Sequence, residues 1–270
     1  SPYAGHCYIF WPAESSGRGF LPVLMSGSIL VAFDFDHTII DENSDLSVIK
    51  LAPGGELPEE IQAKYSDNGW TNYMGAIFEY LHKNGRTKDD FAKCMYDIPF
   101  TDGFPELFQY LRDDCFEVII ISDSNMKFIE FSLENAEISD VVYAIYTNPA
   151  HFDNSGCLRI QYYHEQDWCD LSTVNLCKGH ILQEHIKQRN RDGVGFRHVV
   201  YVGDGYNDLC PALTMKQHDY ICPRKNFKLW REMKRLGVLD GEAGELDLKA
   251  KIVEWDSGIQ ILGLLKTLNG

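Results

Sequence analysis

Four largely apolar runs recur at wide intervals along the chain, and each has the length of a strand. They cover residues 29–33, 116–121, 199–202 and 219–222. Because the first run is apolar at every position, we expect both of its faces to be buried, as in the centre of a parallel sheet. Helical patterns separate the runs, and this alternation predicts βαβ units with right-handed crossovers. The expected fold class is α/β, with a mostly parallel sheet flanked by helices.

The stretch between the first two predicted strands is much longer than a single crossover helix requires. The proline and glycines at residues 53–55, and Gly85, would interrupt a helix. Three helical patterns lie within the stretch, at residues 59–65, 71–82 and 88–96. We therefore predict a small helical cap, residues 41–99, inserted after the first strand. Residues 29–40 and 100–270 are expected to form the core.

Residues 143–163 have a different, extended pattern. Asn154, Ser155 and Gly156 stand in the middle of this segment as turn residues. The pattern predicts a β-hairpin built on a pair of strands. Three further helices are predicted, at residues 126–135, 176–190 and 258–268, and the last of them is apolar enough to close the core.

The N-terminal residues precede the first predicted strand. Residues 1–24 contain apolar patches but no basic start followed by a continuous apolar segment, so they are a poor match to a secretory signal. Met25, Ser26 and Gly27 stand directly before the strand. Our hypothesis is that the natural start lies at or near Met25 and that residues 1–28 form a poorly ordered extension.

Composition narrows the class of partner. Forty acidic against 25 basic residues give a formal net charge of −15, which repels the phosphate backbone of nucleic acids and anionic membranes. Eight cysteines lack the density of a disulfide scaffold, which predicts reduced thiols and a cytoplasmic location. A small phosphorylated metabolite remains a suitable partner if a metal ion and lysines supply local positive charge. Composition leaves the oligomeric state open.

Two carboxylates, Asp34 and Asp36, stand where the first predicted strand breaks into a loop. In open α/β sheets, ligands bind just beyond the carboxyl ends of the strands. Three more polar segments follow in order: Ser122 after the second strand, Lys178 at the start of a helix, and residues 203–208 after the third strand. Each alone has an ordinary explanation as a helix cap or a solvated loop. Together, in this order, they indicate phosphoryl-transfer chemistry.

These four segments resemble the motifs of the haloacid dehalogenase superfamily of aspartyl-phosphate phosphatases. Those motifs are DxDx[TV], a Ser or Thr after the second strand, a Lys, and GDxxxD. The resemblance covers the chain from Ile29 onward. It implies a Rossmann-like haloacid dehalogenase fold with a cap inserted after the first strand.

The resemblance also implies a role for each motif residue. Asp34 would attack phosphorus and form a covalent aspartyl-phosphate. Asp36 would protonate the leaving oxygen and later deprotonate the hydrolytic water. Ser122 and Lys178 would stabilise the charge on the phosphoryl group. The implied cofactor is Mg²⁺. Its ligands would be Asp34, the backbone carbonyl of Asp36, Asp204 and, in support or through water, Asp208.

Longer segments are similar to the phosphoethanolamine/phosphocholine phosphatase family, which includes the pyridoxal-phosphate phosphatase. They are residues 31–45, 119–125, 147–150, 175–178, 201–211 and 223–225. Residues 119–125 and 255–258 look closer to the pyridoxal-phosphate branch, so pyridoxal 5′-phosphate is the favoured substrate. Phosphoethanolamine, phosphocholine and pyrophosphate are alternatives. Two further hypotheses remain. The chain could be a phosphotransferase that passes the phosphoryl group to an acceptor other than water, or a regulator that binds a metabolite without turnover.

In that family, acidic residues near the catalytic pair are placed to meet a cationic group of the substrate. Asp45 and Asp123 match those positions, and Asn125 of the same motif is assigned to substrate binding with them. The structural alternatives are a helix cap for Asp45 and a turn for Asp123. Three aromatic residues at helical spacing are expected in the core of the cap rather than at the substrate: Trp70, Tyr73 and Phe78.

Relatives in the family carry a cysteine and histidine cluster before the catalytic lysine. Here that stretch keeps His164, Cys169 and Cys177. A structural zinc site needs about four ligands, so this set is one short unless an acid such as Asp167 contributes. The sequence therefore does not predict a zinc site.

Overall fold

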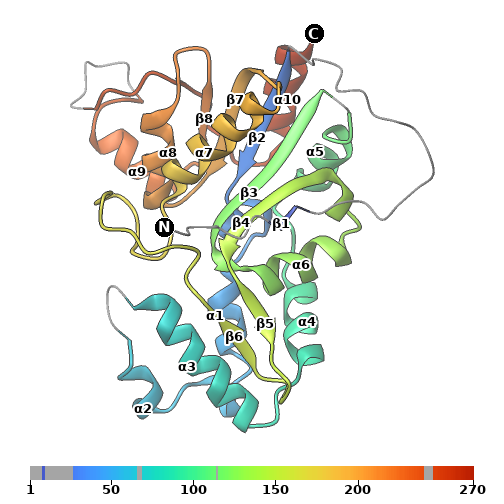
Figure 1. The fold of residues 1–270 in the computed structure, drawn as a ribbon, viewed down its shortest axis with the longest axis vertical. Helices are drawn as coiled ribbons and strands as arrows, with labels where there is room; N and C mark the ends of the chain where they lie inside the picture. The colour runs from blue at the N-terminus through green and yellow to red at the C-terminus, as the bar shows by residue number, and fades with distance from the viewer. Residues whose placement is uncertain (1–7, 10–26, 66–68, 114, 240–245) are drawn as a thin grey trace.

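The computed structural model describes residues 8–9, 27–65, 69–113, 115–239 and 246–270. Almost all of the predicted N-terminal extension, Met25 included, lies outside this range. Within it, a seven-stranded sheet has the order β1-β4-β3-β2-β7-β8-β9 (Figure 1). Neighbouring strands run parallel, except β1, which pairs antiparallel with β4 at the edge. The strands are β1 (Tyr8–Ile9), β2 (Ser28–Phe33), β3 (Phe116–Asn125), β4 (Val142–Asn148), β7 (Phe196–Gly203), β8 (Tyr220–Pro223) and β9 (Lys251–Ile252).

The apolar run of β2 lies at the centre of the sheet and is buried on both faces. Ile29, Val31 and Phe33 pack on one side, and Leu30 and Ala32 on the other, all without measurable exposure. Complete burial of such a side chain contributes about 1.5–3 kcal/mol, which is why a run without polar residues folds as a central strand. Helices cover the first face with α5 (Phe104–Tyr110), α6 (Met126–Asn135) and α10 (Gly258–Asn269), and the second with α7 (Lys178–Arg191), α8 (Leu209–Thr214) and α9 (Lys228–Arg235).

The four predicted core strands are confirmed as β2, β3, β7 and β8, but the prediction for residues 143–163 is partly wrong. Val142–Asn148 forms β4, a parallel neighbour of β3 in the main sheet. Only β5 (Ala150–Phe152) and β6 (Leu158–Ile160) pair as the antiparallel hairpin. Residues of β4 are buried on both faces of the strand, which suits a position inside the sheet better than a two-stranded ribbon.

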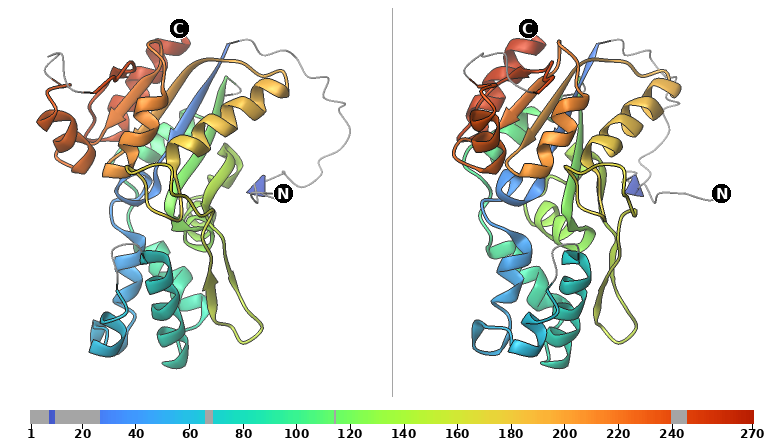
Figure 2. Two further views of the ribbon diagram at one scale, coloured as in Figure 1. Left: turned by 60° about the vertical axis from the view of Figure 1, so that its left-hand side comes forward. Right: turned by 90° about the vertical axis from the view of Figure 1, so that its left-hand side faces the viewer.

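A helical segment follows β2 and lies beyond one end of the sheet (Figure 1). It contains α1 (Ser44–Ile49), α2 (Glu59–Gln62), α3 (Trp70–Lys83) and α4 (Lys88–Asp97), with single turns at η1 (Phe35–Ile39) and η2 (Pro53–Gly55). The β5–β6 hairpin extends along α3, as both views of Figure 2 show. Arg159 of the hairpin forms an ion pair with Glu79 of α3, and Asn72 donates a hydrogen bond to Tyr162 at 2.9 Å. The hairpin is thus part of the surroundings of the helical segment.

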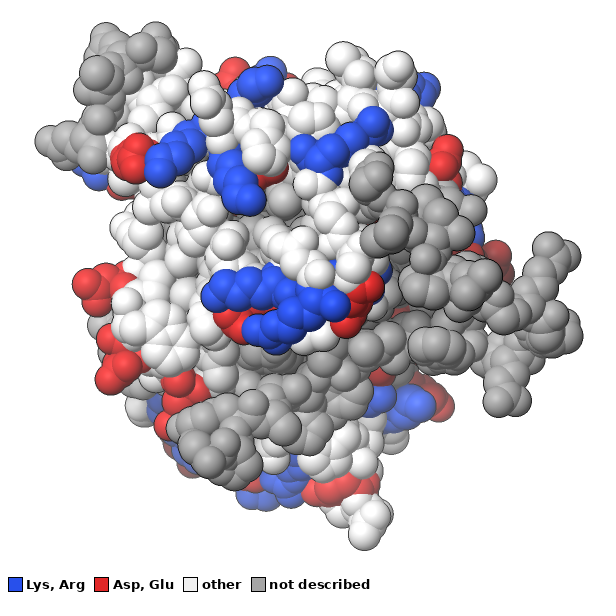
Figure 3. All heavy atoms as spheres, turned by 45° about the horizontal axis from the view of Figure 1, so that its top comes forward, with Lys and Arg blue, Asp and Glu red and all other residues white. Residues whose placement is uncertain are grey.

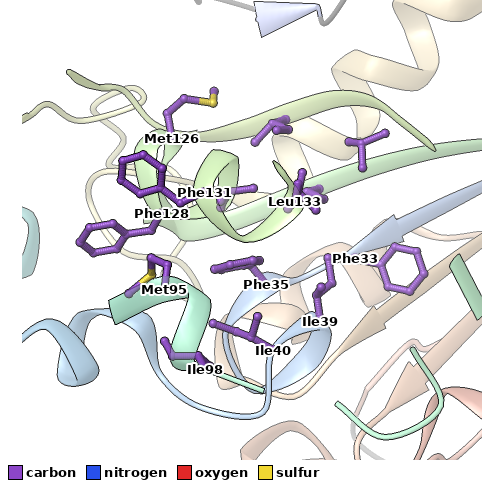
Figure 4. Packing of buried hydrophobic residues seen from close by; sticks show 14 of the residues in the cluster. Phe33, Phe35, Ile39, Ile40, Met95, Ile98, Met126, Phe128, Phe131 and Leu133 are labelled. Carbon is purple, nitrogen blue, oxygen red and sulfur yellow. The ribbon is translucent and has the colours of Figure 1, made fainter. Parts of the chain in front are cut away.

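The apolar core is continuous between the sheet and the helical segment. Met95 of α4 and Ile98 lie beside Phe35 and Ile40, which directly follow β2 (Figure 4). The linkers of the segment also pair with each other, since Ile40 and Phe100 form an antiparallel bridge. The helical segment therefore leaves and rejoins the core at one place.

The surface carries mixed charge. On the face shown in Figure 3, lysine and arginine side chains lie in small groups with acidic side chains beside them. No helix within the described residues combines the length and apolar character needed to span a membrane.

Candidate active site

The polar segments predicted from the sequence meet at the carboxyl ends of β2, β3 and β7. Asp34 follows β2, Ser122 lies near the end of β3 and Asp204 follows β7. Lys178 enters from the side as the first residue of α7. The parallel strands bring together groups that are up to 170 positions apart in the chain, since Asp34 is residue 34 and Asp204 is residue 204.

Lys178 joins two carboxylates at the centre of the site. Its Nζ atom lies 2.6 Å from Oδ2 of Asp34 and 2.8 Å from Oδ1 of Asp208. The lysine side chain is only 1% exposed. Burial lowers the pKa of Lys178, but the charges of Asp208 and Asp34 outweigh burial and raise it well above its usual range. The ammonium group is therefore a permanent positive charge beside Asp34.

Asp208 uses both of its oxygens to hold this arrangement. Oδ1 also accepts a hydrogen bond from the Tyr201 hydroxyl at 2.7 Å. Oδ2 accepts from the backbone N–H groups of Asp204 at 3.0 Å and Gly205 at 2.8 Å. A side chain at Gly203 would place its Cβ 2.4 Å from Oδ2 of Asp208, so only glycine fits there. Asp208 thus positions Lys178 and the loop after β7.

Asp204 completes a cluster of acids. Its carboxylate lies within 4.8 Å of those of Asp34 and Asp208 and accepts a hydrogen bond from the Thr38 hydroxyl at 3.3 Å. Burial raises the pKa of Asp204 to about 8, and the charge of Asp34 adds to this effect. Burial likewise raises the pKa of Asp34 to about 7, against the opposing effect of Lys178. Three buried acids face one lysine, so the cluster carries an excess of negative charge when ionised.

Asp36 lies beside this cluster, at the boundary with the helical segment. Its Oδ1 accepts a hydrogen bond from the backbone N–H of Ser44 at 2.8 Å, at the start of α1. Burial raises the pKa of Asp36 to about 8, and the nearby charge of Asp45 raises it further. A carboxyl group with that pKa carries its proton at neutral pH, which is the state that a general acid requires.

The loop that carries Asp36 has an unusual backbone shape. His37 has φ of 54°, in the left-handed region that non-glycine residues rarely adopt. Arg224 fixes this shape by donating hydrogen bonds to the His37 carbonyl and to Asp41 Oδ1, both at 2.6 Å. Such strain persists only where surrounding contacts hold it, and it is frequent at active sites.

Ser122 lies near the carboxyl end of β3. It is 1% exposed, and its Oγ accepts a hydrogen bond from the backbone N–H of Ser124 at 3.2 Å. This contact leaves the hydroxyl hydrogen of Ser122 to be donated. The hydroxyl can therefore donate to an oxygen of a bound anion.

Asp123 and Asn125 already have structural partners. The carboxylate of Asp123 accepts hydrogen bonds from Asn207 Nδ2 at 2.8 Å, Asn175 Nδ2 at 3.0 Å and Thr173 Oγ1 at 3.3 Å. Burial raises the pKa of Asp123. Asn125 caps α6 through its Oδ1. Their assignment to substrate binding stays a prediction.

Asp45 has one satisfied and one unsatisfied oxygen. Oδ2 accepts a hydrogen bond from Trp70 Nε1 at 2.7 Å. Oδ1 is buried and has no hydrogen-bond partner among the described residues. Burial raises the pKa of this carboxyl group to about 6. The alternative of a helix cap is wrong, because Asn43 caps α1.

Trp70 belongs to a group of aromatic rings beside Asp45. Its ring centroid lies 5.9 Å from that of Tyr65 and 5.6 Å from that of Tyr73. The expectation of a core position is confirmed for Phe78 and Tyr73, which are buried, and Trp70 is partly buried and packs against the same core. Trp70 thus joins the core of the helical segment to the carboxylate of Asp45.

Several contributors to the site were not predicted. Tyr201 lies inside an apolar strand, and Thr38 is part of the first motif without a role of its own. Arg224 stands in a segment that resembles the family, but nothing in its neighbours indicates contact with residues 37 and 41. These roles depend on contacts between segments that are remote in the sequence.

Comparison with known proteins agrees with this geometry. Residues 29–268 match the family model described as "Putative Phosphatase". The mouse protein named pyridoxal phosphate phosphatase PHOSPHO2 is 40% identical over 243 residues, which cover 89% of this chain and 98% of the mouse protein. The human phosphoethanolamine/phosphocholine phosphatase is 34% identical over 234 residues, which cover 86% of each chain.

Solved structures agree on the fold. A phosphoserine phosphatase described as a phospho-aspartyl intermediate analogue aligns with a TM-score of 0.55 and 18% identity, over 89% of this chain and 99% of that one. The resemblance predicted from the motifs is confirmed. The chain belongs to the phosphatase family that includes pyridoxal phosphate phosphatase and phosphoethanolamine/phosphocholine phosphatase, and it is a phosphatase.

Proposed function

We propose that this phosphatase is Mg²⁺-dependent and acts through an aspartyl-phosphate on Asp34. The observation that carries the proposal is the contact of 2.6 Å between Asp34 Oδ2 and Lys178 Nζ, buried beside Ser122 and Asp204. Asp34 Oδ1 accepts from the backbone N–H of Phe35 at 2.6 Å, so the carboxylate is fixed in one orientation. A fixed nucleophile loses little entropy on the way to the transition state.

The residues present fit a Mg²⁺ ion. The acids Asp34, Asp204 and Asp208 gather their oxygens within 4.8 Å, and one lysine offsets only part of their charge. Oxygen donors of this kind suit Mg²⁺. Asp34, Asp204 and the backbone carbonyl of Asp36 would hold the ion, while the oxygens of Asp208 are already engaged with N–H and O–H donors. When bound, Mg²⁺ would offset negative charge on the phosphoryl oxygens.

The side chains divide the two half-reactions between them. Asp34 attacks phosphorus, and the P–O bond to the leaving group breaks while Asp36 donates its proton to that oxygen. Asp36, now ionised, takes a proton from water, which attacks the phosphorus of the aspartyl-phosphate and releases phosphate. Lys178 and the Ser122 hydroxyl face the negative charge in both steps. The described residues and water thus supply the nucleophile, the proton donor and the base, while bound Mg²⁺ would add charge stabilisation.

For the substrate, we favour pyridoxal 5′-phosphate. Among the residues that the structure describes, Asp45 Oδ1 is a buried acceptor without a partner, which suits a cation that bears an N–H group, such as a pyridinium. Trp70 donates to the other oxygen of Asp45 and packs against Tyr65, so aromatic rings that can contact a cation lie near this acceptor. A primary ammonium, as in phosphoethanolamine, also offers N–H donors, whereas the quaternary ammonium of phosphocholine offers none. The name of the mouse relative supports the same choice.

A substrate panel tests the proposal. We would assay the purified chain with Mg²⁺ on pyridoxal 5′-phosphate, phosphoethanolamine, phosphocholine, pyrophosphate and a nucleotide. Release of inorganic phosphate without any added acceptor distinguishes hydrolysis from phosphotransfer. Turnover restricted to pyrophosphate or nucleotides would show that Asp45 does not select a cationic substrate. The Asp34→Asn variant serves as the inactive control, and equal turnover by that variant would contradict the proposed nucleophile.

A cytoplasmic location stays a prediction.

A further inference from the structure

Three cysteine thiols meet next to the active site, from three separate parts of the chain. Cys169 lies in the long loop after β6, Cys177 directly precedes α7, and Cys210 lies in α8. The Sγ atoms of Cys169 and Cys210 are 3.4 Å apart, and those of Cys177 and Cys210 are 3.7 Å apart. All three lie within 4.8 Å of one another. We call these residues the thiol cluster.

The spacing of the thiol cluster is that of a metal site. Zinc–sulfur bonds of about 2.3 Å in a tetrahedron place neighbouring sulfurs about 3.8 Å apart. The observed separations of 3.4 and 3.7 Å are close to that edge length. A disulfide would require about 2.05 Å. Two of the three sulfur pairs therefore already have about the separation found in a zinc coordination shell, and the third pair lies within 4.8 Å.

A hydroxyl group stands where a fourth ligand belongs. Ser172 Oγ lies 3.3 Å from Cys169 Sγ. Residues 169 and 172 have the two-residue spacing that is usual for paired zinc ligands on one turn. Serine is a poor zinc ligand, so the shell would consist of three thiolates and either this hydroxyl or a water molecule. Of the three residues considered from the sequence, Cys169 and Cys177 lie in this cluster and His164 does not, and Cys210 is the third thiol.

His164 contacts the backbone beside the thiol cluster. Its Nε2 accepts a hydrogen bond from the backbone N–H of Cys177 at 2.8 Å. Gln166 fixes the turn around Cys169 in a similar way, donating to the carbonyls of Cys169, Ser172 and Thr173. The backbone around the thiol cluster is thus held in place by side chains that are not themselves part of the cluster.

The residues around the thiol cluster leave room for it, and the cluster lies where a long loop meets two helices. A side chain at Gly179 would place its Cβ 2.6 Å from Cys210 Sγ, so glycine there allows the thiol to approach α7. Residues 161–177 form a loop without a helix or a strand. Loops of this length without a helix or strand are uncommon in compact domains. A metal that joins the loop to α7 and α8 would secure it.

From this geometry we propose that Cys169, Cys177 and Cys210 bind one Zn²⁺ ion, with Ser172 or water as the fourth ligand. The ion is structural and separate from the proposed Mg²⁺ site, since soft thiolates select zinc and carboxylates select magnesium. Binding converts three thiols to thiolates and releases their protons to solvent. Because Cys177 precedes Lys178 and Cys210 follows Asp208 by two positions, the ion would hold both ends of the Lys178–Asp208 ion pair.

Metal analysis of the full chain tests the proposal. Protein purified without chelators should contain about one zinc ion per chain, and Cys210→Ser should remove nearly all of it. Cys94→Ser, in a half-buried cysteine of α4 away from the cluster, should retain it. Ser172→Cys completes a set of four thiolates and should lower the dissociation constant for zinc by about tenfold or more.

A second measurement needs no variant. Co²⁺ added to the metal-free wild-type chain should produce the visible absorption of tetrahedral thiolate coordination, and added Zn²⁺ should abolish it. Either of two results would overturn the proposal: metal-free protein that gives no such absorption, or a disulfide between Cys169 and Cys210 in protein purified under reducing conditions. Phosphatase activity enters neither readout, so failure here is distinct from failure of the proposed substrate.

Discussion

The hydroxyl groups of Ser44 and Ser124 lie 2.8 Å apart and join the first turn of α1 to the end of β3. Both residues are almost fully buried, at 0% and 2% exposure. The backbone N–H of Ser44 is also the donor to Asp36. This contact therefore connects the helical segment to the core beside the catalytic acid.

A double-mutant cycle measures the contact. Ser44→Ala and Ser124→Ala each remove one partner of the hydrogen bond. The double variant should lose less unfolding free energy than the two single variants lose together, by about 0.5–1.5 kcal/mol, because no unpaired hydroxyl remains. Urea unfolding followed by fluorescence gives the free energies. Strictly additive losses would show that the two hydroxyls do not interact.

Removal of the buried lysine should damage both folding and turnover. Lys178→Met leaves Asp34 and Asp208 without their cation, which should cost about 3–5 kcal/mol of stability and at least about a hundredfold in kcat. Lys225→Met is the matched control, because its ion pair with Asp256 is exposed. A Lys178→Met enzyme with normal kcat would exclude a role for this charge in catalysis.

Glycine at position 203 is required by its neighbour. In Gly203→Ala the new Cβ would lie 2.4 Å from Asp208 Oδ2 and push that carboxylate away from Lys178. We expect a loss of about 1–3 kcal/mol in stability together with a lower kcat. Gly195→Ala meets no atom within 4 Å and should change neither quantity. Similar effects at both positions, in unfolding and kinetic assays, would count against the close contact.

The raised pKa of Asp45, about 6, predicts how substrate binding depends on pH. Above pH 6 the group is ionised and attracts a cationic substrate; below pH 6 it is neutral and does not. The KM advantage of wild type over Asp45→Asn for phosphoethanolamine should therefore shrink as pH falls from 7.5 to 5. Titration of the substrate phosphate affects both enzymes alike, so it cancels in the ratio of the KM of Asp45→Asn to the KM of wild type. A constant ratio would mean that Asp45 does not face the amine.

Mg²⁺ should stabilise the chain more at high pH than at low pH. The pKa values of Asp34 and Asp204, about 7 and about 8, lie above those of unfolded carboxyls. Without metal, stability should therefore decline as pH rises from about 4 through 8, since ionisation is disfavoured in the folded state. Metal binding needs the ionised forms, so the rise in Tm on adding Mg²⁺ should be larger at pH 8 than at pH 6. Calorimetry with Asp204→Asn, which should show little response, checks the assignment.

Local sequence carried the prediction of the motif residues. Asp34, Ser122, Lys178 and Asp204 each stand next to the element that positions them, so the alternation of strands and helices was sufficient to bring them together. The helix predicted at residues 126–135 has the same bounds in the structure, where Asn125 caps it.

Contacts between remote segments could not be predicted in the same way. The apolar pattern of β4 is compatible with either a hairpin or a core strand, and only its neighbour β3 decides between them. Cys210 joins the thiol cluster across 33 positions from Cys177, and Trp70 meets Asp45 across 25. Periodicity contains no information about such pairs.

The paired linkers and the β5–β6 hairpin together define how the helical segment can move. Two adjacent linkers, joined through Ile40 and Phe100, would by themselves act as a single hinge with one free axis of rotation. The hairpin leaves the core separately, after Asn148 at the end of β4, and is bound to α3 through Arg159. A body attached at a third point off its hinge axis cannot rotate unless that attachment bends or breaks. Any substrate exchange at Asp34 that required such a rotation would therefore deform the hairpin.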